Sequence, residues 1–324
     1  MSDFIKNLLV LALPASGKSE ARKYMSSLTP DQCREIFHIG PTVQLDDYPY
    51  VEFMRAIDEV TDHILHLGTL FFVDHDRSFV DPHEWGTLVE LLNEDYADLV
   101  AEKDISSAHP ALDLFKRIDA AQQRAGAKIK LGRLPKDVLD VMDVQLDKVA
   151  RKVSDAKQAL CKAGLKDGET LVVEFARGGP VGPMPLDPPY GYGYCVSRLS
   201  PQILKDAAVL NVWVDPEESR RKNFARAVPP PGVDDTSIYH GVPLCVMLDD
   251  YGCDDMEWLL ETSGEPNTIR IDAHGETYML RTARFDNRDD KTTFVRTKPW
   301  SKEDVRTIHD ELKQAMDILA GARY

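Results

Sequence analysis

An unbroken apolar stretch that stops at a short turn and a lysine constrains the fold of this chain more than any other feature of its sequence. Residues 7–13 read NLLVLAL, and residues 14–20 read PASGKSE. A short run that is apolar throughout is typical of a strand buried on both faces of a parallel sheet. The Pro-Ala-Ser-Gly segment interrupts that strand, and a helical pattern runs from Ser19 to Met25. The sequence therefore predicts a buried strand, a turn and a helix, which together form the unit of α/β folds.

The turn has the composition of a phosphate-binding loop. Residues 12–19, ALPASGKS, fit the P-loop pattern GxxxxGK(S/T) with Ala12 in place of the first glycine, and Ala15 is a second missing glycine that predicts a stiff loop. In such a loop, backbone N–H groups and a helix N-terminus face the anion, the lysine reaches the β- and γ-phosphates, and the hydroxyl binds Mg²⁺. Lys18 is thus a candidate catalytic residue and Ser19 a candidate magnesium ligand. The residues that we assign to nucleotide binding in this loop are Pro14, Ala15, Ser16, Gly17, Lys18, Ser19 and Glu20.

The segment LALPASGKSE resembles the opening of the P-loop kinases, which include the adenylate kinase, gluconate kinase, polynucleotide kinase and zeta-toxin groups. The motif spans 10 of the 324 residues, about 3% of the chain. This resemblance implies an α/β fold: a three-layer P-loop NTPase core with a mostly parallel sheet and an inserted helical region. It also implies ATP and Mg²⁺ as ligands. On this basis we expect a core of residues 1–80 and 166–324 with a lid at about 216–245, and an inserted helical arm on the acceptor side at 81–165.

Acidic residues follow two further predicted strands. Residues 40–48, GPTVQLDDY, read as a strand that ends in Asp46 and Asp47, and a later apolar run ends at Glu174. In the P-loop kinases that it resembles, a carboxylate at the first position holds or deprotonates the acceptor hydroxyl. Asp46 and Asp47 are therefore both candidate catalytic residues, and the sequence does not choose between them; a solvated turn before Pro49 is the alternative. The resemblance implies that Glu174 supports the magnesium water shell.

A loop rich in glycine, proline and tyrosine follows Glu174. Residues 178–194 read GGPVGPMPLDPPYGYGY and cannot form a regular element. Their place at a strand end favours a substrate lid or an aromatic platform, with a purely structural loop as the alternative. We therefore assign substrate contacts to Tyr190 and Tyr192, an acceptor phosphate to Arg177, and an acceptor hydroxyl to Asp47.

A basic helix and a polar strand end complete the predicted site. Residues 220–226, RRKNFAR, hold four basic residues in an otherwise acidic chain. This resembles the lid helix of nucleotide kinases, so Arg221 and Arg226 are candidate catalytic arginines and Arg220 a candidate nucleotide contact. A solvated helix face paired with neighbouring glutamates is the alternative. Asn287 follows a predicted hairpin, and the resemblance makes it a candidate contact to adenine.

The predicted helical arm carries a narrow apolar seam. From Leu139 to Leu160 the apolar residues step by three and four, which indicates a helix with heptad spacing. The seam belongs either to packing within the arm or to a homodimer or partner interface, and the sequence leaves both open.

Two histidine-containing segments have the composition of metal sites. His63 and His66 lie three residues apart on a predicted helix, without a third ligand nearby. Residues 70–79, LFFVDHDRSF, read either as a strand that ends in charge or as a substrate-facing loop. On a strand, Asp74, His75 and Asp76 alternate between faces and do not converge on one ion.

Composition limits the partners and the compartment. The formal net charge of −15 disfavours a nucleic-acid partner, because the long-range repulsion of phosphates is strong. The five cysteines form no CxxC pair, which predicts reduced thiols and a cytoplasmic protein. No apolar run has the length of a membrane helix, so no membrane association is expected.

These observations favour an ATP-dependent phosphotransferase that acts on a small hydroxyl- or phosphate-bearing acceptor. A nucleoside or nucleotide is the first expectation, since arginines and tyrosines suit a phosphate and a stackable ring. The alternative is a P-loop ATPase or nucleotide-gated regulator that uses the helical arm as a partner interface. A nucleic-acid end kinase is a further alternative, against which the net charge argues.

Overall fold

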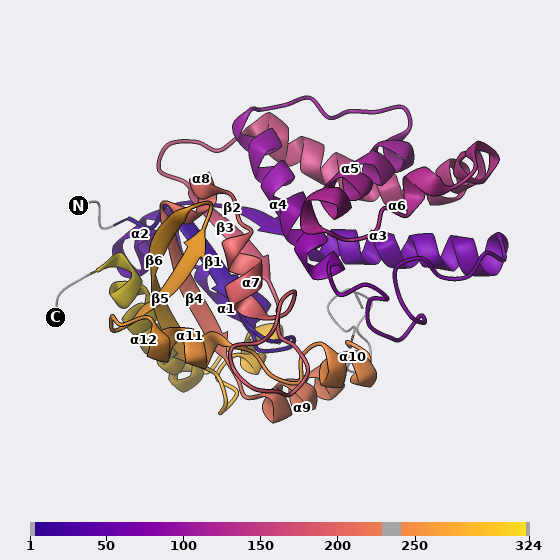
Figure 1. Cartoon of the computed structure of the whole chain (residues 1–324). Helices are drawn as coiled ribbons and strands as arrows, with labels where there is room; N and C mark the ends of the chain where they lie inside the picture. The colour runs from indigo at the N-terminus through magenta and orange to yellow at the C-terminus, as the bar shows by residue number, and fades with distance from the viewer. Residues whose placement is uncertain (1–3, 229–240, 322–324) are drawn as a thin grey trace.

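Six strands form one sheet in the order β2-β3-β1-β4-β6-β5 in the computed structural model, which describes residues 4–228 and 241–321 (Figure 1). The first five strands in that order run parallel, and β5 pairs antiparallel with β6. The prediction of an α/β fold with a mostly parallel sheet is confirmed. The strands are β1 (Asn7–Leu11), β2 (Thr42–Asp46), β3 (Thr170–Phe175), β4 (Ala207–Trp213), β5 (Thr268–Ala273) and β6 (Glu276–Asp286).

Strand β1 lies in the middle of the sheet and is buried along its whole length. It pairs with β3 on one side and with β4 on the other, so that Asn7 lies opposite both Leu171 and Ala207. Leu8 and Val10 belong to the hydrophobic core on one face of the sheet. Leu9 and Leu11 belong to the core on the other face. An apolar run without alternation is what such a strand requires.

Helices cover both faces of the sheet. On one face, α1 (Lys18–Met25), α2 (Pro30–Phe37) and α12 (Lys302–Ala320) pack against the strands around a core that includes Phe37 and Leu312. The starts of α2 and α12 are capped: the side chain of Thr29 accepts from the N–H of Gln32, and that of Ser301 accepts from the N–H of Asp304. On the other face lie α7 (Gly191–Ser197) and α11 (Met256–Thr262), and Figure 1 shows α7 in front of the sheet.

A group of longer helices stands beside the sheet, at the right of Figure 1. They are α3 (Tyr48–Glu59), η1 (Val60–Ile64, a π-helix), α4 (Glu84–Val100), α5 (Pro110–Ala125) and α6 (Lys136–Ala163). They share one continuous hydrophobic core with the sheet. In the predicted heptad seam, Met142, Leu146 and Val153 are buried, and α6 packs on α5 and α3 of the same chain. This packing favours the first interpretation of the seam, in which it belongs within the arm.

Short elements connect these layers. They are α8 (Pro201–Leu204), α9 (Pro216–Arg226), α10 (Leu244–Asp249), η2 (Leu131–Arg133) and η3 (Thr293–Arg296). The predicted lid at 216–245 includes α9 and the start of α10, but residues 229–240 lie outside the described part of the chain.

No helix in the described ranges combines the length and the apolarity that a bilayer crossing needs.

Residues 65–83 form a long loop, not a strand of the sheet. Only Phe72 and Phe79 pair, as an isolated antiparallel bridge. The buried carboxylate of Asp58, on α3, accepts hydrogen bonds from the N–H groups of Leu70 (2.8 Å), Phe71 (3.0 Å) and Phe72 (2.8 Å). A side chain thus takes the donors that a neighbouring strand would otherwise use, which is why the strand interpretation of 70–79 is wrong.

Asp58→Ala is expected to lower the free energy of unfolding by roughly 3 kcal/mol, because three buried N–H groups lose a charged acceptor. Urea unfolding measures this loss. Asp155→Ala, which removes an exposed carboxylate from α6, serves as the control and should change stability by less than about 0.5 kcal/mol. Equal stability of the two variants would show that Asp58 does not anchor the loop.

Candidate functional site

A pocket of about 410 Å³ opens at the edge of the sheet where β1, β2 and β3 end. The chain leaves β1 for α1 on one face and leaves β3 for α7 on the other, and crevices at such points are where open α/β sheets bind ligands. The turn after β1 forms one wall. The ends of β2 and β3, parts of α3 and α4, the 65–83 loop, the end of α9 and the segment around α10 form the rest.

All seven residues of the predicted phosphate-binding turn, Pro14 to Glu20, line this pocket. Gly17 has a φ of +103°, and a Cβ there would collide with the side chains of Thr292 and Asn287. Ala15 also lies in the left-handed region, with a φ of +58°, which costs a residue with a Cβ roughly 1–2 kcal/mol. Helix α1 begins at the pocket, and its first N–H groups have no acceptor within the helix.

Lys18 and Ser16 place polar atoms on this wall. The Nζ of Lys18 donates to the carbonyl of Ala12 (3.2 Å). Burial lowers the pKa of Lys18, and the nearby charges of Glu174 and Asp46 act in the opposite direction. Within the described residues, the buried Oγ of Ser16 has no hydrogen-bond partner.

Asn287 lies behind the turn and does not line the pocket. Its Nδ2 donates to the carbonyl of Ser16 (2.5 Å) and to the Oγ1 of Thr292 (2.8 Å), and its side chain is fully buried. The sequence singled out this residue as an adenine contact, whereas the structure gives it the position of a brace for the turn.

The two aspartates after β2 have different surroundings. Asp47 is buried in an ion pair with Arg177 (Oδ2 to Nη2, 2.6 Å), and Arg177 also donates to the carbonyls of Ala176 (2.6 Å) and Trp85 (3.3 Å). Arg177 lines the pocket, but these partners already occupy its guanidinium, so the predicted contact with an acceptor phosphate stays a prediction.

Asp46 forms no ion pair with any described residue, and its Oδ1 accepts from the N–H of Tyr48 (2.9 Å). Burial raises the pKa of Asp46 to about 7, and the charges of Asp47 and Glu174 add to the shift. The structure therefore distinguishes a paired aspartate from one poised near neutrality, which the sequence could not do.

Glu174 lies opposite Asp46 in the sheet register, but a cation already neutralises it. Its Oε2 pairs with the Nε of Arg22 on α1 (2.9 Å). Ser19 is exposed, and it lines the pocket with Asp46 and Glu174, so oxygen ligands of the kind that Mg²⁺ prefers surround one space.

The three arginines of α9 separate into two groups. Arg221 is exposed and pairs with Glu218 (2.6 Å), as the solvated-face alternative expects, and Arg220 does not line the pocket. Arg226 does line it. Burial lowers the pKa of Arg226, and its buried Nε has no hydrogen-bond partner in the part of the chain that the structure describes. Of these three arginines, only Arg226 thus lines the pocket.

Tyr190 and Tyr192 lie outside the pocket. Tyr192 is fully buried against the core, and its hydroxyl accepts from the N–H of Arg177 (3.3 Å). Asp255 draws this segment inward by accepting from the N–H groups of Tyr192 (2.5 Å) and Gly193 (2.9 Å). The contact of the two tyrosines with substrate that the sequence predicts has no support in this arrangement.

An aromatic recess that the sequence did not indicate forms the far half of the pocket. The rings of Phe72 and Phe79 stack at 4.6 Å, Trp85 meets Phe79 edge-on at 4.9 Å, and Tyr251 meets Trp85 at 5.6 Å. The one signal was the interpretation of 70–79 as a substrate-facing loop; Trp85 and Tyr251 come from distant segments and gave none.

Charged groups border the aromatic recess. The guanidinium of Arg55 lies 4.0 Å from the ring centre of Phe72, and Arg77 also lines the pocket. Burial raises the pKa of Asp250 to about 6. The pocket therefore joins the 14–20 turn with the start of α1, a carboxyl group whose pKa is raised to about 7, and an aromatic recess with charged groups at its border.

Comparison of this chain with protein-family models, with curated proteins and with solved structures finds no match. The site must therefore be interpreted from its own geometry.

The raised pKa of Asp46 predicts a pH dependence of stability. A folded-state pKa of about 7, against about 3.9 when unfolded, means that the folded chain holds this proton more tightly. Its contribution to stability is therefore fully present below about pH 4 and is lost as the pH rises to about 7.

Asp46→Asn should remove this loss, so that its stability relative to the wild type increases from about pH 4 to pH 7, as urea unfolding at several pH values will measure. The exposed Asp155→Asn is the control and should follow the wild type. A constant difference between Asp46→Asn and wild type over this range would rule out the raised pKa.

Proposed function

We propose that this chain is an ATP- and Mg²⁺-dependent phosphotransferase of the P-loop kinase type, which phosphorylates a hydroxyl group of a small acceptor. The observation that carries the proposal is the convergence, in one pocket, of the 14–20 turn, Lys18, Arg226 and the carboxyl group of Asp46. Each of these groups has a role in phosphoryl transfer, which depends chiefly on positioning and charge stabilisation.

The turn supplies the nucleotide side of the proposed site. The N–H groups at the start of α1 and the ammonium of Lys18 suit the phosphates of ATP. Two buried groups without partners among the described residues, the Oγ of Ser16 and the Nε of Arg226, fit a ligand with many oxygen acceptors. Ser19 and Glu174 offer an oxygen ligand and a water-shell partner to Mg²⁺, which would neutralise phosphate charge when bound.

Asp46 is the proposed base. A group whose pKa lies near neutrality accepts a proton readily and releases it again, which suits removal of the acceptor hydroxyl's proton. Asp47 is assigned a positioning role, because its carboxylate already pairs with Arg177 and ties the ends of β2 and β3 together.

The aromatic recess supports the choice of acceptor. A flat ring could pack against three aromatic side chains there: Phe72, Trp85 and Tyr251. At the border of the recess, Arg55 offers a hydrogen-bond donor and Asp250 an acceptor. The aromatic base of a nucleoside or nucleotide suits these rings better than a sugar, which has no aromatic ring. No observation favours the regulator alternative, since the heptad seam is covered by α3 and α5, and the net charge of −15 argues against nucleic-acid ends.

Lys18→Ala is expected to reduce phosphoryl transfer by at least about 10²-fold, because charge on the transferring group loses its ammonium partner. The measurement is ADP release with MgATP and a panel of nucleosides, nucleotides and sugars. Arg221→Ala, which removes an exposed arginine outside the pocket, is the control and should keep wild-type turnover. Full turnover by Lys18→Ala, or no acceptor-dependent turnover by the wild type, would contradict the proposal.

Asp46→Asn and Asp47→Asn should fail in different ways. Asp46→Asn should lower kcat by about 10²–10⁴-fold and leave the fold intact, since it removes the base but no ion pair. Asp47→Asn should instead lower the free energy of unfolding by about 3–5 kcal/mol, because the buried Arg177 loses its counter-charge. Steady-state kinetics and urea unfolding of both variants separate these effects, and an active Asp46→Asn enzyme would exclude Asp46 as the base.

A further inference from the structure

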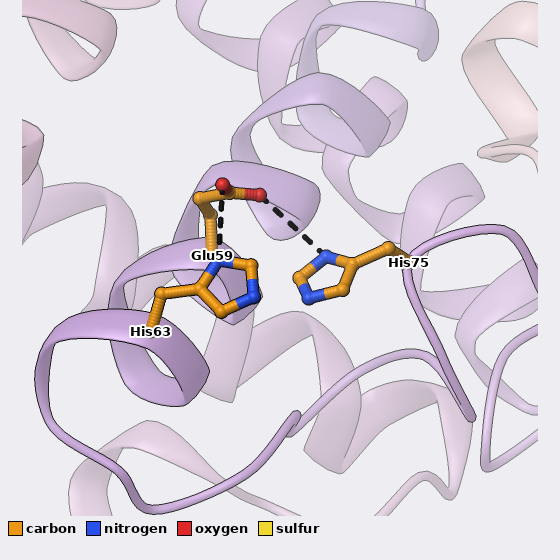
Figure 2. A group of neighbouring side chains, drawn as sticks. All are labelled: Glu59, His63 and His75. Atoms are coloured by element: carbon orange, nitrogen blue, oxygen red, sulfur yellow. Dashed lines mark hydrogen bonds and ion pairs between the residues drawn. The ribbon is translucent and has the colours of Figure 1, made fainter.

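Four ionisable side chains meet on the surface where α3 continues into η1. Glu59 ends α3, Asp62 and His63 belong to η1, and His75 reaches them from the 65–83 loop. Figure 2 shows the carboxylate of Glu59 joined to both imidazole rings by dashed lines. His63 therefore meets His75 and not His66, the residue with which its sequence spacing had grouped it.

The distances in this cluster fit the ligands of a single metal ion. Glu59 Oε1 lies 3.1 Å from His63 Nδ1, and Glu59 Oε2 lies 3.5 Å from His75 Nδ1 (Figure 2). One ligand atom from each of the three residues lies within 4.8 Å of the others. Metal–ligand bonds of about 2.0–2.2 Å place neighbouring ligand atoms roughly 3–3.5 Å apart, so small rotations of these side chains bring all three to one ion.

The remaining ring nitrogens support the same assignment. Both Nε2 atoms face one oxygen of Asp62, at 3.3 Å from His75 and 3.6 Å from His63. Histidines that bind a metal through one nitrogen almost always direct the other N–H to a carboxylate or carbonyl, which orients the ring. Asp62 has this position for both rings at once. The cluster thus contains three ligands and the group that would orient two of them.

The rings of His63 and His75 lie 4.7 Å apart and nearly parallel, at 23°. η1 is a π-helix, a local widening that occurs often at functional sites, and it brings His63 under the loop.

We propose that Glu59, His63 and His75 bind one divalent transition-metal ion, with Zn²⁺ the best match, and that this ion fastens the 65–83 loop to the end of α3. Imidazole with carboxylate suits zinc, while Mg²⁺ prefers oxygen ligands alone. The site is separate from the magnesium of the proposed kinase reaction.

The loop connects this metal site to the pocket. The carbonyl of His75 accepts from Arg55 Nη1 (2.5 Å), and Arg55 in turn covers the ring of Phe72. Asp58 already holds the start of the loop through three N–H groups. A metal ion at His75 would add a second anchor on the far side of the aromatic recess, so its effect is measurable as protection of the loop.

The experiment is a calorimetric titration of the full, chelator-treated chain with Zn²⁺. We expect one ion per chain, no competition by Mg²⁺, and loss of binding in His63→Ala and in His75→Ala. Asp62→Asn should weaken binding about 10–100-fold, because the rings lose their orienting partner. His66→Ala is the matched control, since His66 is exposed, lies three residues from His63 and is outside the cluster; it should bind as the wild type does.

A second measurement keeps the result independent of folding defects. Circular dichroism checks each variant, and Glu59→Gln, a nearly isosteric change at an exposed position, should also lose affinity. Bound Co²⁺ should give a nitrogen- and oxygen-type spectrum. Zn²⁺ should slow hydrogen exchange of residues 65–83 in the wild type and in His66→Ala, but not in His63→Ala or His75→Ala. Unchanged binding in both histidine variants, or a strong thiolate charge-transfer band from Cys245 or Cys253, would overturn the site. Binding without added loop protection would overturn the fastening role.

Discussion

The burial of β1 on both faces is the constraint on which the remaining structure depends. A central strand with no polar face needs a helix layer on each side, and it receives α1, α2 and α12 on one and the helices of the larger core on the other. Because its neighbours β3 and β4 run parallel to it, their carboxyl ends meet at one edge. The pocket, the turn and the acidic residues lie together for this reason.

Charge pairing decides which groups at that edge remain available. Arg177 neutralises Asp47, and Arg22 neutralises Glu174, so two of the three carboxylates at the strand ends are committed to ion pairs. Asp46 remains, and its burial beside two negative charges is what raises its pKa to about 7. A buried ion pair of this kind contributes modestly to net stability. Its consequence here is that Asp46 is the carboxylate at the strand ends that has no ion-pair partner among the described residues.

The 65–83 loop shows how a segment without regular structure is held over a pocket. Its backbone donors go to Asp58, its aromatic rings stack on one another, and its histidine lies against the end of α3. Loops of this length in compact domains are usually functional, and this one contributes Phe72 and Phe79 to the aromatic recess. The order of the loop thus comes from its own aromatic side chains and from Asp58 and Glu59 of α3, not from pairing with a strand of the sheet.

Local patterns alone were enough to predict β1, β2, β3 and the turn at 14–20, because periodicity and turn-forming residues act over a few residues. The P-loop pattern and the resemblance to P-loop kinases named Asp46, Lys18 and Arg226 as candidates. The sequence could not tell Asp46 from Asp47, because the ion pair of Asp47 with Arg177 forms only in the folded chain. It could not tell Arg226 from Arg221 either, because only the structure shows that Arg221 pairs with Glu218 while Arg226 lines the pocket. Trp85, Tyr251 and the pairing of His63 with His75 depend on contacts between distant segments, and those exist only once the layers have packed.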